Sequence, residues 1–212
     1  MGPKAGRPVF YFHSPATAGE EMSAAASAAE QLNLRLISLR RPSIVSHPGD
    51  DFVTTVAEHT ETVIEELGLD EPAVVGWSGG APYALATLIR LGRRVSAVHL
   101  VSPVPGPLRG PDALPNQTER LRQVAATTAA SSWVTGPATL RDYQALASPW
   151  RFDIGAISQL VTIWAPTEDE IVPLHLVEHL VHSLPSADVV EVAGSHDWLI
   201  NNWSIVLARL RV

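Results

Sequence analysis

The segment Gly76-Trp77-Ser78-Gly79-Gly80 is a G-x-S-x-G motif between a run of short apolar residues and a helix-like stretch. In such a strand–turn–helix setting the serine lies at a strained turn, and glycines two residues to either side leave room for that turn. The helix that follows directs free N–H groups and a partial positive charge at the same point. The motif therefore predicts that Ser78 is a nucleophile. A glycine- and serine-rich loop without chemistry is the alternative.

A serine needs partners to become a good nucleophile, namely a general base within hydrogen-bond reach and a third group that orients the base. In an open α/β sheet the carboxyl ends of the strands share one crevice, so these partners should follow later strands. Two loops meet this condition, residues 167–173 with Asp169 and residues 194–198 with His196. Their order along the chain is the one expected for this architecture. We predict that His196 takes the proton of Ser78 and that Asp169 orients the imidazole.

Strand-like and helix-like stretches alternate along most of the chain. Short apolar, β-prone runs predict strands at residues 9–12, 34–39, 74–77, 95–101, 161–164 and 189–192. Helical spacing of apolar residues, with start and stop signals, predicts helices at residues 20–31, 51–67, 174–184 and 198–210, and a further helix directly after the Ser78 turn. This alternation favours an α/β fold with an open, mostly parallel, doubly wound sheet of about six strands.

Residues 103–150 interrupt the alternation. Prolines at positions 103, 105, 107, 111 and 115 precede helix-like stretches at 117–130 and 140–146. The region is too long for a simple crossover between two strands. We predict a core made of residues 1–102 and 151–212, and a small helical cap made of residues 103–150 over the carboxyl ends of the strands.

The composition narrows the classes of function. The chain has 212 residues, 46% apolar and 17% charged, which suits one globular domain. Its net charge is −7, and we interpret the pairs Arg40-Arg41 and Arg93-Arg94 as solvated ends of elements, so nucleic acid is not an expected partner. The absence of cysteine excludes disulfides and thiolate chemistry.

Residues 1–8 lack the apolar region of a signal peptide, and the uncharged run 73–89 is broken by glycines and a proline. We therefore expect no membrane span and a cytoplasmic location.

Three motifs together resemble those of α/β-hydrolase fold proteins, of the small-molecule esterase and lactonase type with a cap. They are Gly76–Gly80, the box Asp169-Glu170-Ile171-Val172-Pro173, and Gly194-Ser195-His196. The resemblance covers nearly the whole chain outside the cap, and its boxes carry the nucleophile, acid and base. Acidic residues flank Asp169 on both sides, and the box pattern favours Asp169 among them. Asp197, next to His196, is expected to start a helix.

The resemblance implies a serine hydrolase that acts on an ester or lactone of a small apolar molecule through a Ser-His-Asp triad, with no cofactor. The N–H of Gly79, with a donor from residues 13–17 such as Ser14, would form the oxyanion hole. Trp77, His13 and Trp198 are expected to contact the substrate. Trp133 and Trp150 are further candidates for a pocket wall, and ordinary core packing is the alternative for each tryptophan.

The chain departs from the family in two places. The family's first strand usually ends in His-Gly and a residue whose N–H completes the oxyanion hole, whereas His13-Ser14-Pro15 stands here. Proline has no N–H to give. The family also has a β-hairpin before the first strand, and its absence predicts that residues 34–39 form an unprotected sheet edge. A homodimer paired at that edge is one hypothesis.

These departures keep two other functions open. The altered loop favours a non-hydrolytic enzyme of the same fold, such as a lyase, cyclase or rearrangement catalyst, in which His196 acts as acid or base. The missing hairpin and small cap favour a non-catalytic ligand-binding protein, although such a protein has no need of a complete triad.

The segment His175-Leu176-Val177-Glu178-His179 matches the zinc-protease signature H-x-x-E-H, and His182 adds a third histidine. Short motifs match by chance often. This helix fits a crossover between two strands and should lie outside the sheet, so we favour ordinary packing and expect no metal. Residues 116–118 are likewise a formal glycosylation sequon with no secretory context.

Overall fold

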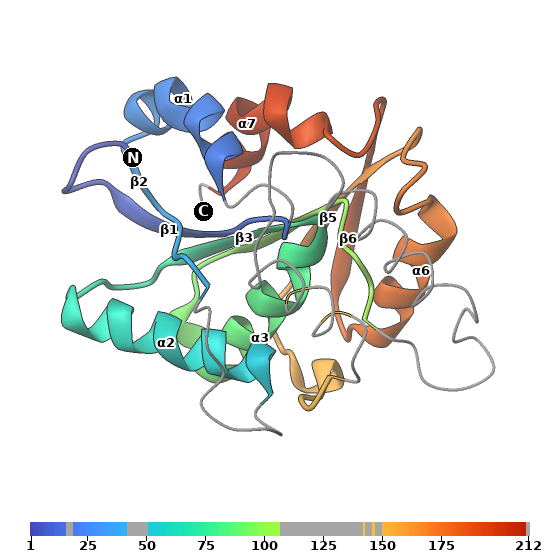
Figure 1. Ribbon diagram of the computed structural model, residues 1–212, viewed down its shortest axis with the longest axis horizontal. Coiled ribbons are helices and arrows are strands. Elements are labelled where there is room, and N and C mark those ends of the chain that lie inside the picture. Colours follow the sequence, from blue (N-terminus) through green and yellow to red (C-terminus); the bar gives the residue numbers. More distant parts are fainter. Residues whose placement is uncertain (16–18, 42–50, 107–141, 143–145, 147–149, 211–212) are drawn as a thin grey trace.

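The computed structural model describes residues 1–15, 19–41, 51–106, 142, 146 and 150–210. One sheet of six strands, all paired in parallel, runs through these residues in the order β2-β1-β3-β4-β5-β6 (Figure 1). The strands are β1 Arg7–Phe12, β2 Leu34–Ile37, β3 Ala73–Trp77, β4 Val98–Val101, β5 Val161–Pro166 and β6 Ala187–Val192. The predicted open parallel sheet is therefore confirmed.

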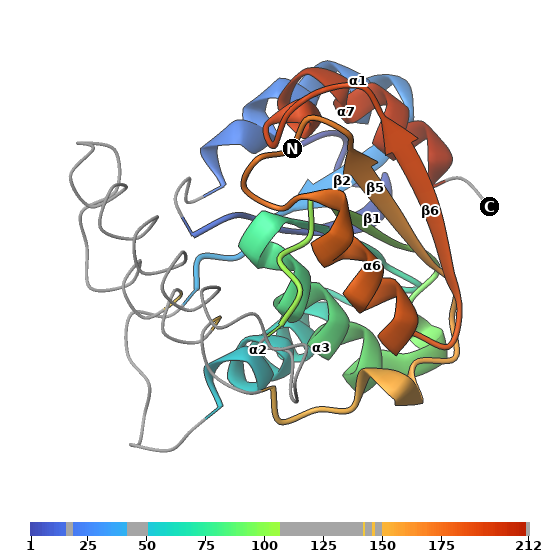
Figure 2. The ribbon, with the colours of Figure 1, turned by 90° about the vertical axis from the view of Figure 1, so that its right-hand side faces the viewer.

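Helices cover both faces of the sheet, as the alternation of elements requires. The α-helices are α1 Ala26–Gln31, α2 Phe52–Glu66, α3 Ala81–Leu91, α6 Leu174–Ser183 and α7 Trp198–Arg209. Short 3₁₀ turns lie at η1 Glu20–Ala25, η2 Ser78–Gly80, η3 Gly92–Arg94 and η4 Ile154–Ala156. Figure 2 shows α1 and α7 on one face, and α2, α3 and α6 on the other. The predicted helix 20–31 is divided between η1 and α1, and the strand predicted from residue 95 begins at Val98, because η3 and its turn to Val95 precede it.

Two apolar clusters form the core, one under each helical layer. One joins α2, α3 and α6 to the sheet, and the other joins α1 and α7 to it. The strands β1, β3 and β4 are buried along nearly their whole length, which matches the continuous apolar runs that parallel strands need. The sheet is therefore a rigid base whose carboxyl ends can hold side chains in fixed positions.

The outer edge of β2 is covered in part, which corrects the expectation of an unprotected edge. The amino group of Met1 donates to the Leu36 carbonyl at 2.8 Å, and the Leu36 N–H donates to the Met1 carbonyl at 2.9 Å. Gly2 lies so close to this edge that a Cβ atom there would be 2.0 Å from the Leu34 oxygen. The segment before β1 thus occupies backbone groups that a second chain would need for pairing.

The two flanks of the segment between β4 and β5 contact each other at Gly106 and Trp150. A Cβ atom on Gly106 would lie 2.3 Å from the Trp150 indole, so the ring rests directly on that backbone. Trp150 in turn stacks on Phe152 with ring centroids 5.2 Å apart. Of the predicted cap, the structure describes Asp142 and Leu146, both helical, and the two flanks; the stretch 117–130 and Trp133 lie outside the described residues.

No helix within the described parts of the chain is long and apolar enough to cross a membrane.

His99 gives the fold a dependence on pH. It is buried on β4, and its Nδ1 accepts a hydrogen bond from the Trp164 indole at 3.2 Å. Burial, aided by Arg209, lowers the pKa of His99 to about 4. The unfolded chain takes up this proton near pH 6.5 and the folded chain only near pH 4, so the free energy of unfolding falls as the pH falls between these values.

We expect His99→Gln to flatten this dependence by up to about 1.4 kcal/mol per pH unit between pH 6.5 and pH 4. Urea unfolding at several pH values, for the parent and the variant, measures the slope. Equal slopes in the two proteins would contradict the assignment of this acid sensitivity to His99.

Candidate active site

Ser78 lies at the turn between β3 and α3, where the motif predicts it. Its φ is 53°, a left-handed conformation that side chains other than glycine rarely adopt. The Val104 N–H donates to the Ser78 carbonyl at 3.1 Å, which ties the turn to the segment after β4. The turn is therefore strained and supported by a neighbouring segment, as a nucleophile elbow would be.

The loops after β5 and β6 bring Asp169 and His196 to this serine. The Nε2 atom of His196 lies 2.8 Å from the Ser78 Oγ, and its Nδ1 lies 2.8 Å from the Asp169 Oδ2. The other oxygen of Asp169 accepts the N–H groups of Ile171 and Val172 at 2.9 and 2.8 Å. The Asp169 side chain is fully buried, so its orientation is set by these bonds. The structure thus brings together all three residues that the motifs indicate.

The loop that carries His196 is held by hydrogen bonds from the last residue of β3 and the first residue after β4. The Trp77 indole donates to the His196 carbonyl at 3.0 Å, and the Ser102 hydroxyl donates to the same oxygen at 3.3 Å. The Trp77 ring also lies beside the imidazole, with centroids 5.9 Å apart. Because Trp77 is buried in the core under α7, these contacts favour a positioning role over the predicted contact with substrate.

Trp198 packs in the core, and Asp197 lies at the start of α7. Trp198 is 9% exposed and stacks on Trp164 with centroids 5.5 Å apart. A Cβ atom on Gly194 would lie 2.8 Å from its ring, so the indole supports the loop before His196. These contacts favour core packing over the predicted contact with substrate. Asp197 precedes α7, and its carboxylate accepts a hydrogen bond from Ser195 at 2.6 Å rather than from the imidazole.

The loop after β1 departs from the expected oxyanion pattern in space as well as in sequence. A Cβ atom on Gly79 would lie 2.7 Å from the Pro15 Cδ and 2.7 Å from the Leu146 Cδ1. The Pro15 ring therefore lies directly against the residue after the nucleophile. Ser14 is buried beside it, and residues 16 and 17, two other sources of a donor, lie outside the described residues.

His13 is bound within the protein. It is 5% exposed, and its Nδ1 lies 2.7 Å from the Ser14 carbonyl oxygen and 3.0 Å from the Arg41 Nη2. Burial, with the Arg41 charge as a second cause, lowers the pKa of His13 to about 3, so the imidazole is neutral at pH 7. These contacts favour a packing role over the predicted contact with substrate.

Arg41 is the residue that the sequence interpretation placed wrongly. Its side chain is 4% exposed and pairs with Asp142 at 2.7 Å, so it is not a solvated end of an element. Tyr83 donates to the same carboxylate at 3.0 Å. Burial raises the pKa of Asp142 above its ordinary value, and the Arg41 guanidinium opposes that rise. No local pattern in the sequence points to this pair, because its two members are 101 residues apart.

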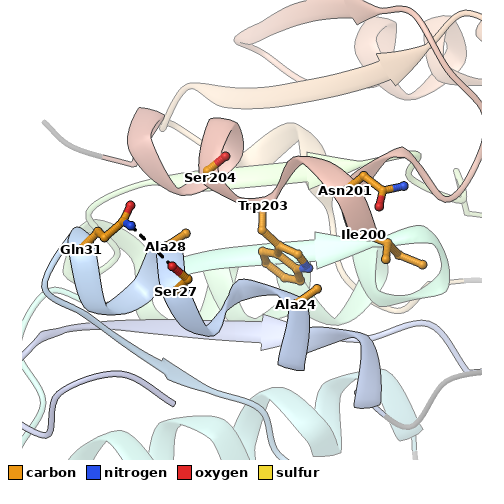
Figure 3. A pocket seen from close by; sticks show the side chains of 8 residues that line it. All are labelled: Ala24, Ser27, Ala28, Gln31, Ile200, Asn201, Trp203 and Ser204. Atoms are coloured by element: carbon orange, nitrogen blue, oxygen red, sulfur yellow. Dashed lines mark hydrogen bonds between the residues drawn. The ribbon is translucent and has the colours of Figure 1, made fainter.

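Two other features stand apart from the triad. His175 and His182 are exposed on α6, with the His182 Nδ1 bound to the Glu178 carbonyl, and no group of three or more candidate metal ligands occurs within the described segments. A hollow of about 170 Å³ lies between α7 and the η1–α1 segment (Figure 3), and its lining, which includes Ser27 and Trp203, contains no triad residue.

Solved structures of other proteins share this architecture. An esterase from Exiguobacterium antarcticum matches with a TM-score of 0.78 and 16% identity, over 97% of this chain and 91% of its own. An N-acyl homoserine lactone degrading enzyme matches with a TM-score of 0.73 and 16% identity, over 97% of this chain and 92% of its own. The 2-hydroxy-6-oxo-6-phenylhexa-2,4-dienoate hydrolase of Rhodococcus sp. strain RHA1 matches with a TM-score of 0.73 and 16% identity, over 99% of this chain and 90% of its own.

The protein has the α/β-hydrolase fold, as the three motifs indicate, and this fold extends over nearly the whole chain. No protein-family model and no curated protein sequence matches it.

Proposed function

We propose that the protein is a serine hydrolase that cleaves an ester or lactone of a small apolar molecule through Ser78, His196 and Asp169. The observation that carries this proposal is the continuous hydrogen-bonded chain from the Ser78 hydroxyl through the imidazole to the buried carboxylate. Such a chain turns a weak nucleophile into a reactive one.

In the proposed reaction the Ser78 Oγ attacks the carbonyl carbon while its proton passes to the His196 Nε2. Asp169 accepts the Nδ1–H, holds the tautomer and stabilises the imidazolium. The tetrahedral intermediate then expels the alcohol, which takes its proton from His196, and leaves an acyl group on Ser78. Water, deprotonated by His196, releases the acid and restores the hydroxyl. The Gly79 N–H would donate to the oxyanion.

The choice of substrate class has two supports. The side chains of Pro15 and Leu146 lie against Gly79, so the wall beside the residue after the nucleophile is apolar. Proteins of the same fold include an esterase and a lactone-degrading enzyme. Because one fold hosts many chemistries, the site and not the likeness carries the assignment.

We also propose that residues 103–150 form a cap over this site. The supports are the contact between Gly106 and Trp150, which brings the two flanks together, and the contact of Leu146 with Gly79 beside the nucleophile.

A fluorophosphonate tests the proposal, because it reacts only with an activated serine. Intact-mass spectrometry should show one adduct on the parent and none on Ser78→Ala. Thr87→Ala is a suitable control, since this buried hydroxyl lies on α3 outside the triad and the adduct should persist. A folded parent that takes up no adduct would exclude an activated Ser78, and an adduct on Ser78→Ala would place the reactive group elsewhere.

The contact of Pro15 with Gly79 favours a second candidate, a lyase, cyclase or rearrangement catalyst of the same fold. Proline provides no N–H at this point of the oxyanion site, and one missing donor typically costs about 100- to 1000-fold in rate. Here His196 would act as acid or base and Ser78 would only bind substrate. Retained turnover in Ser78→Ala, together with loss in His196→Ala, distinguishes this candidate from the first.

A further inference from the structure

A buried polar cluster lies beside the site and takes no part in the proposed chemistry. Arg41 follows β2, Asp142 belongs to the excursion after β4, and Tyr83 lies in the first turn of α3. The Arg41 Nε donates to the Asp142 carboxylate at 2.7 Å, and the Arg41 guanidinium lies 4.8 Å from the centre of the Tyr83 ring. The cluster therefore joins three separate parts of the chain.

The same guanidinium reaches the loop after β1. The Arg41 Nη1 donates to the His13 carbonyl at 2.9 Å, and its Nη2 lies 3.0 Å from the His13 Nδ1. Pro15, two residues further on, lies against Gly79. Arg41 thus fixes the backbone from which the oxyanion loop starts.

Asp142 provides the matching contact on the other side. It is only four residues before Leu146 in the sequence, so the position of Asp142 limits that of Leu146. Leu146 is buried, and its side chain lies against Gly79, as that of Pro15 does. One ion pair therefore holds two segments that meet at the residue after the nucleophile.

We propose that Arg41 and Asp142 are positioning residues that hold the His13–Pro15 loop and Leu146 against Gly79, and so set the geometry of the oxyanion site. This inference rests on the proposed function of Ser78. A buried ion pair is rarely needed for stability alone, since apolar residues of similar size often replace one without loss. That property makes the two roles separable by experiment.

The test compares the parent with Arg41→Met/Asp142→Leu, which removes both buried charges together. The rate of fluorophosphonate adduct formation at Ser78, kcat and KM for p-nitrophenyl acetate, and the Tm are measured for each protein. We expect Tm to stay close to that of the parent while the adduct rate and kcat fall about 100-fold, because displacements near 1 Å have such effects on rate. KM should change little. Arg90→Met/Glu61→Leu, which removes an exposed ion pair between α2 and α3, should leave every value unchanged.

Two milder variants, Arg41→Lys and Tyr83→Phe, keep both buried charges. We expect Arg41→Lys to retain part of the rate that the double variant loses, because a lysine keeps the positive charge but cannot make all the guanidinium contacts. Tyr83→Phe removes one hydrogen bond to Asp142 and should also lose less than the double variant.

Each outcome decides the inference. A folded double variant that reacts at the parent rate overturns the positioning role and leaves the proposed function intact. A parent that forms no adduct overturns both. If the double variant does not fold, Arg41→Lys and Tyr83→Phe decide, and parent rates in both overturn the inference.

Discussion

His196→Ala is expected to lower kcat for an ester substrate by about 10⁶-fold, because loss of the base from a triad costs nearly as much as loss of the whole triad. The structure supports so large an effect, since His196 contacts Ser78 and Asp169 at 2.8 Å each. Turnover of p-nitrophenyl acetate by the purified variant measures it. The control is His175→Ala, an exposed histidine on α6 that should leave kcat unchanged.

Asp169→Asn extends this prediction and should lower kcat by about 10⁴-fold, since the amide stabilises the wrong tautomer of the imidazole. The variant pair also tests whether the residues act as a unit. His196→Ala combined with Asp169→Asn should be no slower than His196→Ala alone. Turnover close to that of the parent in either single variant would contradict the triad.

Gly80→Ala is expected to destabilise the fold by more than about 3 kcal/mol, the second large effect. A Cβ atom at this position would lie 1.9 Å from the Phe12 oxygen and 2.6 Å from the Phe12 carbonyl carbon. Both are backbone atoms of β1, so no side-chain rotation relieves the overlap. Urea unfolding, or the yield of soluble protein, measures the loss.

Gly68→Ala is the matched control for Gly80→Ala. Nothing lies within 4 Å of a Cβ atom at Gly68, and only its φ of +58° opposes the change. Its cost should be about 1 to 2 kcal/mol. A Gly80→Ala protein as stable as Gly68→Ala would mean that β1 and the nucleophile turn can move apart, against the packing described here.

The contact of Ser78, His196 and Asp169 could be predicted from the sequence because each of the three has a local signal. Glycines flank Ser78, Asp169 begins a short box after an apolar strand, and His196 follows a glycine after another strand. Parallel topology then brings the strand ends together without further information. The ends of α2 were predicted to within one residue for the same reason, since Asp51 caps this helix and Gly68 follows its end.

The parts that could not be predicted depend on contacts between segments far apart in sequence. Arg41 and Asp142 are 101 residues apart, and neither position carries a pattern that names the other. The apolar run before Ser78 predicts that Trp77 lies in a strand. Only the packed sheet shows that its indole donates to the carbonyl of His196. The bonds between Met1 and Leu36 likewise follow from the path of the chain before β1 and not from residue type.

The contact of Gly106 with Trp150 affects how easily the length and sequence of the segment between them can change in evolution. Gly106 and Trp150 are in contact, so the two ends of the chain segment between them are held together. Doubling the length of a loop whose ends are held in this way costs only about 0.6 kcal/mol in chain entropy. We therefore expect changes in length between residues 107 and 141 to leave β4 and β5 in register. Under the proposed function, substrate preference would then change with this segment while Ser78, His196 and Asp169 stay unaltered, provided that the new segment keeps an acidic residue to meet Arg41.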